Sequence, residues 1–131
     1  MKIVIVGAGK VGYSLAQRLI QDDHDVYVID RSPERIHNLE NTLDVSLVLG
    51  NGSDVQLLNE IDMSDVGMFI AVTDSDEVNM LSCSVAKIKG VPSHNSIWKL
   101  TLCTRYRGEH TRSPSIFLPG IYYHNRKYGN L

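Results

Sequence analysis

The chain has 131 residues, of which 43% are hydrophobic and 21% charged, and this composition fits one globular domain with a buried core. No apolar run approaches the roughly 20 residues that cross a bilayer, and the first residues predict a strand rather than a signal peptide, so we expect a soluble intracellular protein. The two cysteines, Cys83 and Cys103, form no C-x-x-C pair, which favours reduced packing residues over a metal site or a disulfide.

The first stretch of the chain, MKIVIVGAGKVG, predicts a strand followed by a phosphate-binding turn. Residues 2–6 are a β-branched run without turn formers, typical of a buried strand. In the G-x-G-x-x-G pattern that follows, Gly7 permits the tight turn, Gly9 lets backbone approach a pyrophosphate, and Gly12 lets the next helix lie close to the sheet. Free N–H groups at the start of that helix would face the phosphates. The remaining residues of this candidate site are Ala8, Lys10 and Val11, and Lys10 fits an exposed lysine equally well.

A helix and a second strand follow this turn. Apolar residues recur at helical spacing after Gly9, at Val11, Leu15, Leu19 and Ile20. Residues 26–29 predict the second strand, and Asp30 stands at its end, about 20 residues past the glycines, where a carboxylate accepts hydrogen bonds from an adenosine ribose. A carboxylate repels a 2′-phosphate, which favours NAD or ATP over NADP, although Arg31 is able to accommodate that phosphate.

The next elements add a loop to the same candidate site. Ser32 predicts a helix cap, with Pro33 at the first helical position. Residues 45–49 predict a third strand, and its place in the fold suggests that the loop after it borders adenine; the loop residues are Gly50, Asn51, Gly52 and Ser53. We expect Ser53 to cap a short helix.

A fourth strand and a fourth helix complete the regular pattern. Residues 68–72 predict the strand. Thr73 and Asp74 follow it, either as a helix cap alone or as a cap that also borders the cofactor. Either Asp74 or Ser75 starts the helix, and its predicted core stripe consists of Val78, Leu81, Val85 and Ile88.

Strands and helices alternate throughout this part of the chain. The pattern predicts an α/β fold, a doubly wound parallel sheet (Rossmann fold) with helices on both faces in three α/β/α layers. The carboxyl ends of parallel strands meet at one edge, where such sheets bind their ligands, so the candidate residues should converge there.

The chain changes character near residue 92. Residues 1–92 carry 7 Lys/Arg and 14 Asp/Glu, whereas residues 93–131 carry 6 Lys/Arg and 1 Asp/Glu. We therefore predict a nucleotide-binding domain at 1–92 and a divergent basic tail at 93–131, with a possible fifth strand at 98–102 and irregular structure after it. Non-native sequence, from a reading-frame shift or a vector, is one hypothesis for this tail, and a native tail that contacts anionic lipid or a channel is the other.

No motif of this sequence predicts catalysis. The histidines lack the spacing of a metal site, so we expect no metal, and no nucleophile–base pair is evident, so we expect no catalytic residue. A dehydrogenase also needs a substrate region beside the nicotinamide, and little patterned sequence is left for one.

Four stretches resemble the TrkA family, whose regulator of potassium conductance N-terminal domain (RCK N or KTN) is the NAD-binding domain of Trk potassium uptake systems. They are MKIVIVGAGKVGYSLAQRL, VYVIDRSPERI, VLGNGSD and MFIAVTDSDEVNMLSCSVAKIKGVP, and they cover residues 1–92. The last stretch is the most specific, because a generic Rossmann dehydrogenase is not expected to carry AVTDSDEVNML after its fourth strand.

The resemblance implies a nucleotide-sensing regulatory subunit and not an enzyme. Its implied ligands are NAD or NADH, with ATP or ADP as competing ligands. Its implied partners are copies of itself, in a dimer or tetrameric ring, and a membrane-embedded potassium-translocating subunit, which would hold it peripherally on the cytoplasmic face of the membrane; no nucleic acid is expected. The family's arginine after the fifth strand has no clear counterpart here, although Arg105 or Arg107 stands near that position.

Two other functions remain open from the sequence. One is an NAD-dependent oxidoreductase or a fragment of one, which hydride transfer with a defined substrate would reveal. The other is an assembly module with a vestigial nucleotide site, which failure to bind any nucleotide would reveal.

Overall fold

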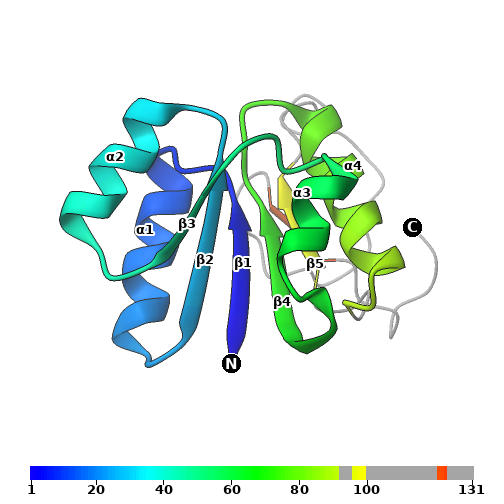
Figure 1. Cartoon of the computed structure of the whole chain (residues 1–131), viewed down its shortest axis with the longest axis horizontal. Helices are drawn as coiled ribbons and strands as arrows, with labels where there is room; N and C mark the ends of the chain where they lie inside the picture. Colours follow the sequence, from blue (N-terminus) through cyan, green and yellow to red (C-terminus); the bar gives the residue numbers. More distant parts are fainter. Residues whose placement is uncertain (92–95, 100–120, 124–131) are drawn as a thin grey trace, which may run out of the picture.

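The computed structural model describes residues 1–91, 96–99 and 121–123, and these form one sheet with helices on both faces (Figure 1). The strand order is β3-β2-β1-β4-β5-β6; the first five strands are parallel, and β6 runs antiparallel to β5. In chain order the elements are β1 (Lys2–Val6), α1 (Lys10–Gln21), β2 (Asp25–Asp30), α2 (Pro33–Thr42), β3 (Ser46–Leu49), α3 (Val55–Glu60), a 3₁₀ turn η1 (Met63–Asp65), β4 (Val66–Ala71), α4 (Asp76–Ile88), β5 (Ser96–Lys99) and β6 (Ile121–Tyr123). The chain steps outward from β1 to β3 and then returns to place β4 on the other side of β1.

The central strand β1 is buried on both faces, which explains its unbroken apolar sequence. Ile3 and Ile5 pack in a cluster with residues of α1 and α2, whereas Val4 and Val6 pack in a second cluster with residues of α3 and α4. Figure 1 shows the same division, with α1 and α2 on one side of the sheet and α3 and α4 on the other. The predicted three-layer doubly wound fold is thereby confirmed.

Each helix of the described chain is shorter than a bilayer span. Among the residues that the structure describes, no helix combines the length and apolar character needed to cross a membrane.

The start of α3 differs from its prediction. Asp54, and not Ser53, is the N-cap of this helix, and its carboxylate accepts a hydrogen bond from the Gln56 N–H at 2.9 Å. Ser53 instead donates its hydroxyl to the side-chain oxygen of Asn51 at 2.8 Å. The Ser53 side chain therefore makes a local hydrogen bond within its own loop and does not cap α3.

The buried face of α4 differs from its prediction in part: Val78 and Val85 pack against the core as predicted, whereas Leu81 and Ile88 do not. Leu81 and Ile88 are 56% and 82% exposed, and the buried residues are Asn79, Ser82, Cys83 and Ala86. These residues share one helical face at i, i+3, i+4 and i+7 spacing. Small side chains let α4 approach the sheet closely, and Asn79 binds the preceding loop. Leu81 and Ile88 consequently point outward. Val11, one of the apolar residues that recur at helical spacing in α1, is likewise 40% exposed.

The end of the chain is described only in part. β5 spans Ser96–Lys99, so the predicted strand at 98–102 overlaps it at two residues, and 100–102 lie outside the described residues. β6 lies in a part of the chain for which the sequence predicts irregular structure. Cys103, Arg105 and Arg107 lie outside the described part, and the division of the chain near residue 92 stays a prediction.

We expect Gly12→Ala to disrupt the fold, because a Cβ at this position would overlap the carbonyl oxygen of Gly7. Relief of the overlap would move α1 away from β1 and lower the free energy of unfolding by about 3 kcal/mol or more. Gly9→Ala is the control, since its Cβ would meet one atom, Nη1 of Arg35, at 3.9 Å. Urea denaturation should show Gly9→Ala within about 1 kcal/mol of the parent chain. Equal stability of the two variants would contradict this account.

A second expectation concerns Cys83, where burial raises the pKa of the thiol to about 12 despite a backbone hydrogen bond from Ala71 that lowers it. Between the ordinary thiol pKa of 9.0 and this value, the unfolded thiol ionises and the folded thiol does not. The free energy of unfolding should therefore fall as the pH rises above about 9. For Cys83→Ala, the free energy of unfolding should fall less steeply with pH. Denaturation curves at pH 8 to 10.5 measure this difference. Parallel pH profiles for the two proteins would contradict this origin.

Candidate functional site

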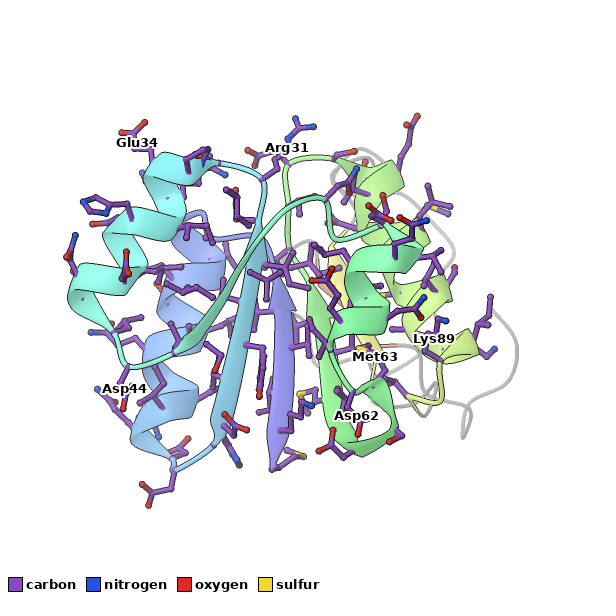
Figure 2. The ribbon with its side chains drawn as sticks, in the orientation of Figure 1. Arg31, Glu34, Asp44, Asp62, Met63 and Lys89 are labelled. Carbon is purple, nitrogen blue, oxygen red and sulfur yellow. The ribbon has the colours of Figure 1, made fainter. Side chains whose placement is uncertain are left out.

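A crevice of about 250 Å³ lies where the central strands β1, β2 and β4 end at the carboxyl edge of the sheet. Figure 2 shows Arg31 at this edge, at the end from which β2 continues into α2, and Asp62 near the opposite end of the molecule. The residues that line the crevice are Val6, Ile29, Asp30, Arg31, Arg35, Gly50, Asn51, Gly52, Thr73, Asp74, Ser75 and Val78. They come from the ends of β1 and β2, from the connections that follow β2, β3 and β4, and from α2 and α4. The crevice therefore stands at the switch in strand order.

The turn from β1 into α1 forms the base of this edge. Gly7 has a φ of +108°, which favours glycine, and its N–H donates to the carbonyl oxygen of Ile29 at 2.8 Å. A Cβ on Gly7 would lie only 3.0 Å from backbone atoms of Val72 and Thr73. The turn thus lies in close contact with the end of β2 on one side and with the segment that follows β4 on the other.

Asp30 ties the glycine turn to the β2–α2 connection. Its Oδ2 accepts a hydrogen bond from the Ala8 N–H at 2.7 Å, and its Oδ1 accepts one from the Ser32 N–H at 2.8 Å. The residue is only 8% exposed, yet it lines the crevice. Each carboxylate oxygen has more than one acceptor position, so Asp30 retains the capacity to accept hydrogen bonds from hydroxyl groups of a ligand.

The N-terminus of α1 differs from those of the other described helices. Ser32, Asp54 and Ser75 each cap their helix by accepting a backbone N–H, whereas the N-cap of α1 is Gly9, without a side-chain cap. The first turn of α1, like that of α3, contains no acidic residue, but α3 has the carboxylate of Asp54 as its cap. The N–H groups and positive dipole end of α1 therefore have no anionic side chain of their own to neutralise them.

The loop after β3 is held against β1 and β2. The Gly50 N–H donates to the carbonyl oxygen of Asp30 at 3.0 Å. Gly52 is buried against Val6, and a Cβ at this position would overlap that side chain. Asn51 accepts hydrogen bonds from both the N–H and the hydroxyl of Ser53, which fixes the loop in a turn.

The connection from β4 to α4 is fixed by a buried asparagine that the sequence interpretation missed. Asn79 has no exposed surface; its Oδ1 accepts the Thr73 N–H at 2.9 Å and the Thr73 hydroxyl at 2.7 Å, and its Nδ2 donates to the Thr73 carbonyl at 3.1 Å. Ser75 adds a bond from its N–H to the Thr73 hydroxyl at 3.2 Å. This network sets the position of Thr73 at the crevice wall. The signal in the sequence for this role was the presence of a polar residue, Asn79, on the face of α4 that packs against the sheet.

Half of the predicted site residues line the crevice. Those that do are Asp30, Arg31, Gly50, Asn51, Gly52, Thr73 and Asp74. The glycine turn lies beside the crevice through the Ala8–Asp30 bond, while Lys10 and Val11 are exposed on α1 and Ser53 binds Asn51. The lining residues that the sequence interpretation missed are Val6, Ile29, Arg35, Ser75 and Val78. Within the described residues no group of acidic, histidine and cysteine side chains is arranged to hold a metal ion.

Comparison with known proteins identifies relatives of this chain. Residues 3–99 match the family model of the TrkA-N domain. A protein named Trk system potassium uptake protein TrkA from Halomonas elongata is 44% identical over 86 residues, which are 66% of this chain and 19% of the relative. A TrkA homolog from Methanothermobacter thermautotrophicus is 39% identical over 92 residues, which are 70% of this chain and 43% of the relative. The chain therefore spans less than half the length of these relatives.

A solved structure shares the fold. The GsuK channel bound to NAD superimposes with a TM-score of 0.63 at 22% identity, over 70% of this chain and 17% of that one. At this identity the similarity establishes the fold alone.

We expect Asn79→Ala to lower the free energy of unfolding by about 2–3 kcal/mol, because it would leave the partly buried backbone groups of Thr73 without their hydrogen-bond partner. Asn59→Ala, at an exposed position of α3, is the matched control and should change stability by less than about 0.5 kcal/mol. Chemical denaturation of the three proteins measures both effects. Similar midpoints for all three would show that the Asn79 network does not hold the loop.

Proposed function

Since this chain belongs to the TrkA-N domain family, we propose that it is a nucleotide-sensing regulatory domain of a Trk-type potassium uptake system, which binds NAD(H) or ATP/ADP in the crevice. The observation that carries this proposal is that Asp30, which lines the crevice, and the uncapped start of α1, which lies beside the crevice, flank the same glycine turn. A hydroxyl acceptor beside an open helix N-terminus suits a ribose joined to phosphates.

Each loop has a role in the proposed binding mode. The phosphates would be held by the turn with Gly7, Gly9 and Gly12 and by the N–H groups of the first turn of α1. Asp30 would accept hydrogen bonds from the ribose hydroxyls. The loop at 50–52 would border adenine, and Thr73 and Asp74 would border the second half of a dinucleotide. The crevice is smaller than the 300–1,000 Å³ of usual ligand sites, so it would enclose part of the ligand.

The proposed partners are further copies of the domain and a membrane-embedded potassium-translocating subunit. The names of the relatives, Trk system potassium uptake proteins, support this partner. The domain would then act from the cytoplasmic face of the membrane, held there through its partner. A nucleotide regulates such an assembly only if it binds the two conformations with different affinity, and a coupling of about 1–3 kcal/mol is typical.

The proposed role requires no chemical step. Turnover of NADH with a defined substrate would instead favour the oxidoreductase, because a sensor binds and releases its ligand unchanged. Absence of nucleotide binding would favour the assembly module with a vestigial site.

Thermal unfolding against NAD⁺, NADH, ATP, ADP and NADPH tests the proposal. A ligand at 100 times its dissociation constant stabilises the folded chain by about 2.7 kcal/mol, which raises Tm by several degrees in a domain of this size. We expect clear shifts with NADH and ATP and little shift with NADPH, since Asp30 would repel the 2′-phosphate. No shift with any of the five would contradict the proposal.

The role of Asp30 is tested by a matched pair of variants. Asp30→Asn should weaken NADH binding about 10- to 100-fold, through loss of charge-assisted hydrogen bonds to the ribose. Asp44→Asn makes the same chemical change at an exposed position between α2 and β3 and should leave the affinity unchanged. Isothermal titration calorimetry of both variants gives the comparison, and equal affinities would remove Asp30 from the proposed site.

A further inference from the structure

Arg35 spans the crevice and contacts an acidic side chain on each side of it. The residue lies in the first turn of α2, and its Nη1 is 3.7 Å from Oδ2 of Asp30 at the end of β2. Its Nη2 is 3.8 Å from Oδ2 of Asp74, on the connection between β4 and α4. The guanidinium therefore joins the two halves of the sheet across the end of β1.

These two contacts are weak, which leaves the guanidinium available to a ligand. Both distances exceed those of hydrogen bonds. The side chains of Arg35 and Asp74 are 47% and 88% exposed, whereas that of Asp30 is 7% exposed, so only the pair with Asp74 is an exposed ion pair. An exposed ion pair such as Arg35–Asp74 contributes little stability. Asp30 already accepts two backbone N–H groups, so it does not depend on Arg35 for its position. Stabilisation of the fold therefore does not explain why Arg35 lies beside Asp74.

The same guanidinium faces the glycine turn. A Cβ built on Gly9 has one neighbour within 4 Å, and that neighbour is Nη1 of Arg35 at 3.9 Å. The space beside Gly9 is thus open and bounded by a cation. A second hollow, beside α2, shares Asp30, Arg31, Arg35 and Asp74 with the crevice, so Arg35 forms part of the wall between the two and has room to change position.

We propose that Arg35 is a phosphate-binding and specificity-determining residue, whose guanidinium leaves Asp74 to bind the diphosphate of an adenine nucleotide that lies against Gly9. This inference rests on the proposed nucleotide site and adds the group that distinguishes nucleotides with a diphosphate from nucleosides. A planar guanidinium offers parallel donors to two phosphate oxygens, and the diphosphate supplies the negative charge that Asp74 otherwise provides. Asp74 is then a competitor of the ligand for Arg35.

The experiment compares ADP with adenosine, which lacks the diphosphate, by isothermal titration calorimetry on the full chain. Arg35→Gln should weaken ADP binding tenfold or more and change adenosine binding less than twofold. Arg35→Lys, which keeps the charge without the planar pair of donors, should recover part of the affinity for ADP. Asp74→Asn should strengthen ADP binding, because Asp74 competes with the ligand for Arg35. This gain in affinity should be larger in the parent chain than in a chain that already carries Arg35→Gln. Arg18→Gln is the matched control, because Arg18 also pairs with an aspartate, Asp22, at the C-terminal end of α1, where both side chains are exposed.

Three outcomes would overturn the inference, and they separate it from the proposed function. Equal weakening of ADP and adenosine by Arg35→Gln would show that Arg35 only positions Asp30. An unchanged affinity for ADP in Arg35→Gln would show that no phosphate contacts this side chain, while nucleotide binding itself would stand. If the parent chain binds neither ADP nor adenosine, the nucleotide site fails and this inference fails with it.

Discussion

The turn between β1 and α1 brings backbone segments together where a side chain has no space. Gly12 lies against the carbonyl oxygen of Gly7, and Gly7 lies against the chain that leaves β4. Because β1 pairs with both β2 and β4, this contact fixes where α1 starts relative to the whole centre of the sheet. The other walls of the crevice are then positioned from the same turn, through the bond between Ala8 and Asp30 and through the packing of Gly52 on Val6.

Buried hydrogen bonds fix the loops at this edge of the sheet, whereas the exposed side chains around the crevice are less constrained. Asp30 and Asn79 are buried, and each accepts two hydrogen bonds that position a loop. Arg35 and Asp74, by contrast, are largely exposed and meet through one long ion pair. A ligand would therefore find a fixed backbone frame with one cation able to change partners. Little conformational entropy would be lost on binding to such a frame, which favours affinity for a small anion.

Under the proposed function, this domain would be one part of a larger assembly. The chain spans 19% and 43% of the lengths of the Halomonas and Methanothermobacter relatives, and it has its own core on each face of the sheet. Under the proposed function, the crevice would convert nucleotide identity into a difference in conformational preference, and the rest of the assembly would respond. Arg35 reaches from α2 to the β4–α4 connection, so exchange of its partner would alter a contact between the two halves of the domain.

The amino-acid sequence by itself determined the parts that depend on neighbouring residues. The β-branched run of β1, the glycine turn, the place of Asp30 at a strand end and the alternation of strands with helices all follow from local preferences, and the structure has them. Tertiary structure alone decided which face of α4 is buried, because close approach to the sheet favoured Ser82 and Ala86 over Leu81. It alone brought Arg35 to Asp74, since that contact joins loops from opposite halves of the sheet and no pattern within one element records it.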